Sequence, residues 1–404
     1  MTKFTVDTRS IARAAKALSS IAPKNGRPEI ISSIVITVDD KNIVELDATD
    51  LRLRAIIRTN AISSAFEIGQ TTASIAVPAD RFFALLSGQD EAETSFTIDP
   101  IKWSLEIVSG RKKSTVKGYD PALYPNTTVP PRIGVEERGR PVIELEIDTL
   151  TQIIQEISLA ASTTESIPIL AGINVEITGN TITAACTDSY RMAASFNHEL
   201  PQGIDVPNQS FTLPAPPLSK AVFMLDQLST SRVVYLQPSD DDIWIQSDNL
   251  SFRMIPLEGR FPNFRSALPD DVPTSFEIDT QKLLSAVRYA SVIGVSKLDF
   301  DATIAKTIIN GEKAHLTISA LDPEAGDALE IVPIDLAGEE VHTVFNAALV
   351  EQHLSNFVKL GMNRLQVMSQ GSQRPFILRP VGFDEYTVVI MPLSNQTRAM
   401  QTDA

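Results

Sequence analysis

The sequence predicts an α+β protein in which one domain is used three times, each copy with two helices and about eight antiparallel strands. Two observations predict this fold. Four landmarks recur in one order at a spacing of about 130 residues, and strand-like alternation flanks each helical run. Solenoid units span only ~20–50 residues, so a repeat of this length is a whole domain.

The first landmark is a strand that ends in Asp immediately before a helix. The three strands and helices are Phe4–Asp7 before Arg9–Ser20, Leu145–Asp148 before Thr149–Ala161, and Phe276–Asp279 before Thr280–Val292. The Asp side chain can accept a hydrogen bond from the first helical turn. We therefore expect a capped helix near the start of each copy.

The remaining landmarks follow in the same order. A strand ends before an Asp in Ile43–Ala48 (Asp50), Thr181–Cys186 (Asp188) and His315–Ala320 (Asp322). A further strand opens a second helix at Val77–Ala79, Leu213–Ala215 and Phe345–Ala347, and the copies close at Tyr124–Asn126, Phe261–Asn263 and Met391–Leu393. Chance similarity would not keep this order three times.

These landmarks predict domains at residues 1–136, 137–270 and 271–394, with a polar C-terminal tail at 395–404. Proline-containing linkers are expected at Thr127–Pro141 and Leu268–Pro273. The tail has little apolar content, and we expect it to be disordered.

Composition places the chain among globular proteins, with 43% hydrophobic and 21% charged residues. No apolar run approaches the ~18 residues that a membrane helix needs, and the N-terminus lacks the apolar core of a signal peptide. The single cysteine, Cys186, excludes an intramolecular disulfide. We therefore expect a cytoplasmic protein with no membrane partner.

The charge of the chain supports two different interpretations. The net charge of −15 argues against nucleic acid, because phosphate binding needs clustered Lys and Arg. The six expected helices nevertheless carry eight basic and four acidic side chains. Either helix surfaces lean positive by accident, or the helices face one channel that holds DNA while acidic sheets face outward. Charge alone leaves both readings open.

Enzyme signatures are missing from the sequence. There is no G-x-x-x-x-G-K-[ST] loop and no G-x-G-x-x-G fingerprint. The histidines (His198, His315, His342 and His353) have no metal-ligand spacing. Cys186 lies within an alternating strand, which favours a buried structural thiol over a nucleophile, and Ser239–Asp242 after Pro238 favours a turn over a cation site. We expect no catalytic activity, cofactor or metal.

Four segments together resemble the beta subunit of bacterial DNA polymerase III, the sliding clamp family. They are Ile169–Ile177, Thr181–Ala193, Leu257–Pro269 and Glu385–Leu393, and the resemblance extends over the chain up to Leu393. It implies a non-catalytic processivity factor that forms a head-to-tail homodimer, a six-domain ring around double-stranded DNA. Retention is then topological and independent of DNA sequence. The partners implied are the DNA polymerase III catalytic subunit, the clamp loader and other clamp-binding-motif proteins.

The resemblance also implies a hydrophobic pocket that binds partner peptides, where the alternative is ordinary core packing at a strand–turn junction. Its residues would be Leu170, Thr187, Tyr190, Arg191, Met192, Pro262, Ala267, Val389, Met391, Pro392 and Leu393. Leu, Met, Val and Pro offer an adaptable apolar surface for a short peptide with one or two apolar anchors. Ser189-Tyr190 stands where the family commonly has Gly-His, so we expect a differently shaped pocket.

DNA contacts are assigned partly by resemblance and partly by charge. Arg27, with Lys24 beside it, matches a family loop at the channel mouth, whereas Arg9, Arg13, Lys16, Lys282 and Arg288 are helix candidates by charge alone. For the latter five, an ordinary solvated face is the competing interpretation. Pro214–Pro217 replaces a basic pair common in the family, which weakens the expectation of DNA contact there.

The subunit interface implied by the family joins the first copy of one chain to the third copy of another. Arg111, Lys112, Lys113 and Val116 would meet Val292, Ile293, Glu324, Asp327 and Glu330. Basic against acidic side chains would set the orientation. Ser114 stands where an aromatic is common, so a weaker dimer is expected. Two rivals remain: an α+β hydrolase or nucleotide-binding enzyme, and a non-encircling scaffold of the same fold.

Overall fold

The computed structural model describes residues 1–393 except 126–129, 132, 134–140, 165, 202–206, 240, 270–271, 295–296 and 305–313. The described chain forms two compact units. The first comprises Met1–Thr151, Leu200–Pro207 and Pro216–Pro256, and the second comprises Gln152–Glu199, Asn208–Ala215 and the chain from Leu257 onward. Most of the expected linker Thr127–Pro141 and the whole tail 395–404 lie outside the described residues.

The three copies have the same order of elements. The first contains β1 (Thr2–Asp7), α1 (Thr8–Ser19), β2 (Ser33–Asp39), β3 (Ile43–Thr49), β4 (Leu53–Ala65), β5 (Thr72–Pro78), α2 (Ala79–Ser87), β6 (Glu93–Asp99), β7 (Ser104–Ser109) and β8 (Lys112–Lys117). The second contains β9 (Ile143–Glu146), α3 (Ile147–Ile157), β10 (Gly172–Thr178), β11 (Thr181–Thr187), β12 (Arg191–Glu199), β13 (Gln209–Pro214), α4 (Ala215–Leu228), β14 (Val233–Pro238), β15 (Ile243–Ser247) and β16 (Leu250–Met254). The third contains β17 (Thr274–Asp279), α5 (Thr280–Ser291), β18 (Leu298–Ile304), β19 (Ala314–Asp322), β20 (Gly326–Pro333), β21 (Val341–Phe345), α6 (Ala347–Lys359), β22 (Arg364–Ser369), β23 (Phe376–Pro380) and β24 (Tyr386–Ile390). The predicted α+β repeat of two helices and eight strands is confirmed for the described part of the chain.

Aspartate caps two of the three leading helices as expected. The Asp7 carboxylate accepts from the Ser10 amide at 2.8 Å, and Asp279 accepts from the Lys282 amide at 2.8 Å. The prediction is wrong for Asp148, because α3 begins at Ile147, two residues before the expected Thr149, and Asp148 lies inside its first turn. There its carboxylate pairs with Arg232 instead.

The second Asp landmark has a common physical basis in the three copies. In each, one carboxylate oxygen accepts from the backbone amides two and three residues ahead, which turns the chain into the next strand. The pairs are Asp50 with Arg52 (2.9 Å) and Leu53 (2.7 Å), Asp188 with Tyr190 (2.9 Å) and Arg191 (2.9 Å), and Asp322 with Glu324 (2.9 Å) and Ala325 (2.8 Å). The recurring Asp is therefore a turn-forming residue.

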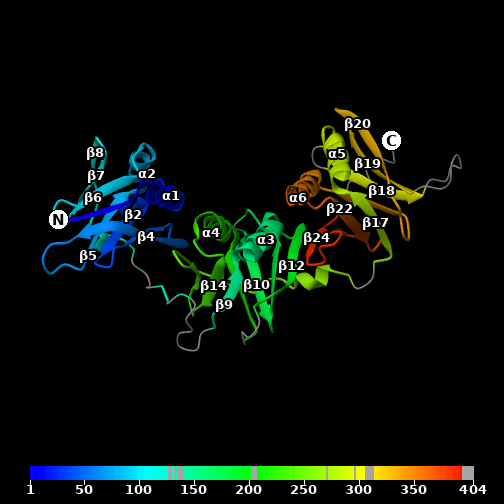
Figure 1. The fold of residues 1–404 in the computed structure, drawn as a ribbon. Coiled ribbons are helices and arrows are strands. Elements are labelled where there is room, and N and C mark those ends of the chain that lie inside the picture. Colours follow the sequence, from blue (N-terminus) through cyan, green and yellow to red (C-terminus); the bar gives the residue numbers. More distant parts are fainter. Residues whose placement is uncertain are drawn as a thin grey trace. The chain divides into compact units, whose positions relative to one another are not determined.

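Antiparallel sheets join neighbouring copies edge to edge. In the first unit a sheet of 12 strands runs β8-β7-β6-β1-β4-β16-β15-β14-β9, with β2, β3 and β5 branching from β4. In the second unit a sheet of eight strands runs β13-β10-β11-β12-β24-β23-β22-β17, and a sheet of four runs β20-β19-β18-β21. The middle copy thus contributes β16 to the first unit and β12 to the second, where β12 lies beside β24 (Figure 1).

Helices cover one face of these sheets and bury a stripe at helical spacing. In α1 the stripe is Ile11, Ala14, Ala15 and Leu18, while Arg9, Arg13 and Lys16 remain exposed. In the second unit α5 packs beside α6 and against β20 (Figure 1). The same 3.6-residue period therefore produces both the core contact and the basic outer face.

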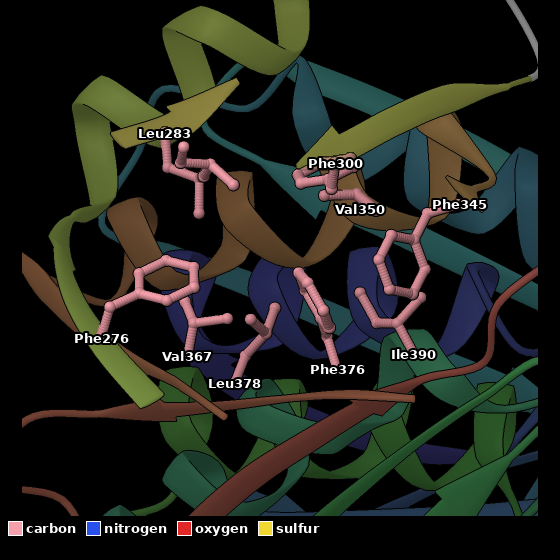
Figure 2. Close-up of a pocket in the computed structure, with 10 residues that line it drawn as sticks. Phe276, Leu283, Phe300, Phe345, Val350, Val367, Phe376, Leu378 and Ile390 are labelled. Atoms are coloured by element: carbon pink, nitrogen blue, oxygen red, sulfur yellow. The ribbon is translucent and has the colours of Figure 1, made fainter. Parts of the chain in front are cut away.

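The core of the third copy contains a small cavity of about 20 Å³ (Figure 2). Phe276, Phe300, Phe345 and Phe376 surround it, with Leu283 of α5 and Val350 of α6 on the helix side. All of its lining residues are apolar, so it offers no polar group to a ligand or a water molecule. It is a packing defect in the core.

Candidate partner-binding surface

The predicted partner residues gather where β12 of the middle copy pairs with β24 of the third. Arg191 lies opposite Ile390 and Met192 lies opposite Val389. A strand that is buried on one face presents alternate side chains to the other face. Met192 and Val389 therefore share one face of the sheet, and Arg191 points to the opposite face, toward the helices.

The turn that leads into β12 is held by its own side chains. The Thr187 hydroxyl donates to the Arg191 carbonyl at 2.8 Å and accepts from the Ser189 amide at 3.1 Å. Ser189 has a φ of +75°. This left-handed conformation is uncommon outside glycine, and it turns the Tyr190 ring outward, leaving 65% of the residue exposed.

Two partners hold the Arg191 side chain under this turn. Its Nε lies 3.0 Å from the Asp188 carboxylate, and one terminal nitrogen donates to the Gln352 side-chain oxygen of α6 at 2.7 Å. Arg191 is buried, so these bonds offset the cost of removing its charge from water. The Tyr190 carbonyl accepts from the Met391 amide at 2.9 Å, which fixes the chain end after β24.

An apolar cluster underlies the turn. Its buried members are Ala185, Met192, Ala194, Phe264, Met368, Ile377 and Val389, and Phe196, Phe261, Ala267, Leu268 and Val272 pack against it half-buried. At its margin Met391 is 41% exposed, and Pro262 is exposed. We call this cluster, with Tyr190, Pro262 and Met391, the partner surface.

Other predicted residues lie near its margins. Pro392 and Leu393 are half-exposed, and the Leu393 amide donates to the Val344 carbonyl at 2.8 Å. Leu170 is buried in a short 3-10 helix (Pro168–Ala171) that leads into β10. Sequence reasoning missed Gln352, Met368 and Ile377. The alternation of β22 and β23 marks the last two as strand residues, but only pairing shows which face they share, and Gln352 carries no local signal.

A buried polar layer lies on the helix side of the same sheet. The Tyr386 hydroxyl donates to the Glu156 carbonyl at 2.5 Å, and Ser195 lies 2.5 Å from the Glu156 carboxylate and 2.6 Å from His198 Nε2. Burial raises the pKa of Glu156 above its ordinary value and lowers that of His198. Because hydrogen bonds tie each of these side chains to a neighbour, we interpret this layer as structural.

His353 of α6 is also buried but makes no such bond. Neither of its ring nitrogens has a hydrogen-bond partner among the described residues. Burial, reinforced by the nearby Arg191 charge, lowers its pKa to about 3. Cys186 is also buried, and burial raises the pKa of its thiol, so a reactive thiolate is disfavoured there.

The basic residues predicted to meet DNA have different surroundings. Arg9, Lys16, Lys24, Arg27 and Lys282 are exposed. Arg13 donates to the Gln227 carbonyl of α4 at 2.5 Å. This carbonyl is neutral, so the contact does not compensate the positive charge of Arg13. Arg288 has no acidic neighbour on α5 itself, but α6 packs beside α5 and brings Glu351 to 2.8 Å from Arg288.

The predicted interface residues lie on edge strands and on the end of α5. Arg111 is exposed in the β7–β8 turn, while Lys112 pairs with Asp90 (2.9 Å) and Lys113 with Glu106 (2.8 Å). Val116 is buried within its own copy. On the third copy Val292 is 75% exposed, Ile293 is half-exposed, and Glu324, Asp327 and Glu330 are exposed.

Two absences hold for the part of the chain that the structure describes. It contains no group of three or more His, Cys, Asp or Glu side chains placed to hold a metal ion. It also contains no helix long and apolar enough to cross a membrane. The expected turn at Ser239–Asp242 is present, closed by the Ser239 amide and the Asp242 carbonyl at 2.8 Å, although Asp240 lies outside the described residues.

Repeated domains with two helices and eight strands, joined edge to edge through antiparallel sheets, define the architecture of a DNA sliding clamp. Residues 144–263 match the central domain of the DNA polymerase III beta subunit, and residues 265–394 match its C-terminal domain. The chain belongs to the DNA polymerase III beta subunit family.

Similar proteins extend this match to the whole chain. The beta sliding clamp of Vibrio cholerae is 22% identical over 393 residues, covering 97% of this chain and 99% of its own. The sliding clamp structure from Bacillus subtilis superposes with a TM-score of 0.83 at 21% identity, covering 97% of this chain and 99% of that one. A Pseudomonas aeruginosa clamp bound to griselimycin has a TM-score of 0.84 at 17% identity, with coverages of 97% and 99%.

Proposed function

We propose that two copies of this sliding clamp close head to tail around duplex DNA and present the partner surface to the polymerase, the clamp loader and other proteins with clamp-binding motifs. The observation that carries the proposal is that two strands equivalent to those of the internal junctions have no partner on one side among the described residues. In the described chain, β16 pairs with β4 and β24 pairs with β12, and these two junctions are equivalent in the repeat. The third junction of the series needs a second chain.

The edges that would form it are β8 and β20. β20 is the third copy's equivalent of β4 and β12, and β8 is the first copy's equivalent of β16 and β24. Each lies at the end of its sheet among the described residues. An open edge exposes unpaired amides and carbonyls and favours pairing with another strand.

The internal junctions predict the register of this pairing. The β15–β16 turn pairs Ser247 with Leu250, and the equivalent β7–β8 turn pairs Ser109 with Lys112. At the first junction Leu250 lies opposite Ile57, whose equivalent on β20 is Glu330. Lys112 of one chain should therefore lie opposite Glu330 of the other, and Lys113 opposite Leu329.

A groove on the third copy supports the same arrangement. It measures about 520 Å³ and lies between α5 and β20, lined by Lys282, Ser285, Ala286, Tyr289 and Glu330 among others. Its counterpart on the first copy, about 420 Å³, is lined in part by Asp248 and Asn249 of the middle copy's β15–β16 turn. We expect the groove on the third copy to be filled in the same way. The residues equivalent to Asp248 and Asn249 would then be Gly110 and Arg111 of a second chain.

Charge favours this contact as well. Arg111 would approach a strand whose exposed side chains include Asp327 and Glu330, whereas Lys112 and Lys113 already pair with Asp90 and Glu106 of their own copy. Complementary charges accelerate association and suppress wrong pairings. Val292 and Tyr289 are 75% and 57% exposed at this face, which adds apolar area to bury. Val116 would act through its backbone, because its side chain is already buried.

The DNA contact we propose is weak and independent of sequence. Arg9, Lys16, Lys24, Arg27 and Lys282 would supply exposed positive charge to the phosphates. A closed ring holds DNA by topology, so tight contacts are unnecessary and would slow sliding. The contribution of Arg288 should be small, because Glu351 compensates its charge. We also propose that the chain is non-catalytic and acts in the cytoplasm.

A cross-link tests the interface. Lys113→Cys together with Leu329→Cys places two thiols on exposed, directly opposed positions of the proposed strand pair, where a disulfide is sterically allowed. The matched control, Lys113→Cys with Ile331→Cys, moves one thiol two residues along the same face. Covalent dimer in the first variant and little in the control supports the register. Equal cross-linking in both, or in neither, contradicts it.

Retention on DNA tests the ring itself. The protein is loaded on nicked circular DNA with a clamp loader and ATP, and the circle is then cut. Loss of protein on linearisation supports encirclement, whereas retention on linear DNA favours a non-encircling scaffold of the same fold. The cross-linked variant, sealed at both interfaces after loading, should resist salt on the circle and still leave the linear molecule.

A further inference from the structure

Two helices from different copies contact each other at the first junction, where β4 pairs with β16. α1 and α4 lie side by side in the first unit (Figure 1). The Lys220 ammonium donates to the Ser20 carbonyl at 2.8 Å, and the Arg13 guanidinium donates to the Gln227 carbonyl at 2.5 Å. Ser20 follows α1 and Gln227 lies in the last turn of α4, so the helices are antiparallel and each presents a cation to the C-terminal end of the other. Carbonyls at such an end favour positive charge.

Phe223 lies between these two contacts. On α4 it follows Lys220 by about 4.5 Å and precedes Gln227 by about 6 Å along the helix axis, and residues three and four apart share a face. Lys16 has the equivalent place on α1, one turn after Arg13 and one turn before the end of the helix. Phe223 is 66% exposed, and Lys16 is exposed. An aromatic ring and a third cation are therefore open to solvent between two cations that hydrogen bonds hold in place.

The positive charge of this helix pair is uncompensated. Arg13 and Lys220 donate to carbonyls, which are neutral. α1 has no acidic residue that could pair with Lys16. The one acidic residue of α4, Asp226, already pairs with Arg232 at 3.4 Å. A ligand that covers the aromatic ring therefore meets a positive field, which favours an anion.

An aromatic ring among cations matches the chemistry of an unpaired nucleotide. A single exposed phenylalanine is common on protein surfaces, but this one lies among three basic side chains. A base stacks on an aromatic face whatever its identity, and the phosphates on either side of it attract Lys and Arg. In duplex DNA the bases stack on one another, so a duplex offers phosphates to the cations but no base to Phe223. The ring is useful only to a single strand.

The other second helices of the repeat lack this combination. Counting from the first residue of each helix, Ser355 of α6 takes the place of Phe223, and Gln352 takes that of Lys220. Both of these polar side chains accept hydrogen bonds from arginines. On α2 the place of Phe223 is taken by Ser87. The repeated fold therefore does not require an aromatic residue here, and Phe223 is particular to the first junction.

We infer that Phe223, with Arg13, Lys16 and Lys220, forms a binding site for single-stranded DNA, in which an unpaired base stacks on the ring and its neighbouring phosphates meet the cations. This inference rests on the proposed function, because it places the site on helices that would face DNA. It also goes beyond that function, since a ring that holds a duplex by topology needs no aromatic contact. Such a site would favour the position at which a duplex ends in a single strand.

Fluorescence anisotropy of a labelled oligothymidylate, titrated with the full chain at low salt, tests the site. Phe223→Leu keeps an apolar side chain and removes the aromatic face, and we expect it to weaken binding by ~5-fold or more. Phe383→Leu is the matched control, because Phe383 is also exposed, at 41%, but lies in the third copy. It should bind as the unmodified chain does. A labelled duplex, and an abasic strand with the same number of phosphates, should not distinguish Phe223→Leu from the unmodified chain.

Three results would overturn the inference. They are an abasic strand bound as tightly as oligothymidylate, an equal loss of duplex and single-strand binding in Phe223→Leu, and no binding of oligothymidylate by the unmodified chain. In each case the ring could still hold duplex DNA, so the test of retention on circular DNA would be unaffected. Retention on linear DNA together with normal oligothymidylate binding would refute the ring and leave this site in place. Circular dichroism of both variants checks that the exposed substitutions leave the fold intact.

Discussion

Replacing His353 with leucine should stabilise the third copy, and increasingly so as the pH falls. His353 is fully buried on α6, and neither ring nitrogen has a partner among the described residues. Burying an unsatisfied polar group costs ~1–3 kcal/mol. His353→Leu removes that cost, because leucine has no polar group to leave unsatisfied. We therefore expect the free energy of unfolding to rise by this amount at pH 7.

The pH dependence follows from the lowered pKa of His353, about 3 against an ordinary value of 6.5. Between these values the unfolded chain binds a proton at this position and the folded chain does not. The folded state therefore loses stability as the pH falls below 6.5, by up to about 1.4 kcal/mol per pH unit. At pH 5 the advantage of His353→Leu should exceed its advantage at pH 7 by about 2 kcal/mol.

Hydrogen exchange of the α6 amides is the appropriate assay, because a chain with several domains need not unfold in one step. The difference in protection between the variant and the unmodified protein is measured at pH 7 and at pH 5. Other titrating groups contribute equally to both proteins and cancel in the difference. A stabilisation that does not grow at pH 5 would show that the imidazole is hydrated or hydrogen-bonded, and would refute the reasoning.

Five further substitutions test the core packing, a buried ion pair and the Asp turns. Val350→Ile places a methylene toward the cavity of about 20 Å³ in the core of the third copy. It should raise the free energy of unfolding by ~0.5–1 kcal/mol, measured as a higher thermal midpoint. A lower midpoint would mean that the cavity cannot accept the methylene. Asp47→Ala removes the ion-pair partner of buried Arg54 and should lower the free energy of unfolding by ~3–5 kcal/mol. Adding Arg54→Met removes the unpaired charge and should recover most of that loss. Asp322→Ala removes the acceptor of two backbone amides and should lower the free energy of unfolding measured by urea denaturation. Asp188→Ala should lower it more, because it also releases Arg191.

The repeat could be predicted from the sequence because its landmarks depend on local chemistry. An Asp that accepts from amides two and three residues ahead makes the same turn wherever it stands, as Asp50, Asp188 and Asp322 do. Features that depend on distant segments could not be predicted in this way. Asp148 has the same local context as Asp7 and Asp279, but Arg232 draws it into an ion pair within the helix. Arg288 is compensated by a residue 63 positions away on a neighbouring helix.

The candidate site also contains residues that local motifs predict and residues that only the folded chain brings together. The residues near the turn and the C-terminal strand were accessible from the sequence, because they lie in two short motifs. Gln352, Met368 and Ile377 were not, because their place depends on how α6, β22 and β23 fold back onto the turn. Sequence alone also could not separate the two junctions. Both have a turn with Thr and Asp, and the difference between them appears only when strand pairing shows which side chains share a face.

The unmatched edges also restrict how the protein can assemble. In the described part of the chain β20 and β8 each lack a strand partner on one side, so a contact that pairs these two edges joins unlike surfaces. Such contacts either close into a ring or continue into a filament, and the outcome depends on the rotation at each junction. The ring that we propose requires closure after two chains, with a third junction that pairs the same types of strand as the two internal junctions. Mass photometry should then show a discrete species of two chains, and a ladder of longer species would contradict the equivalence of the three junctions.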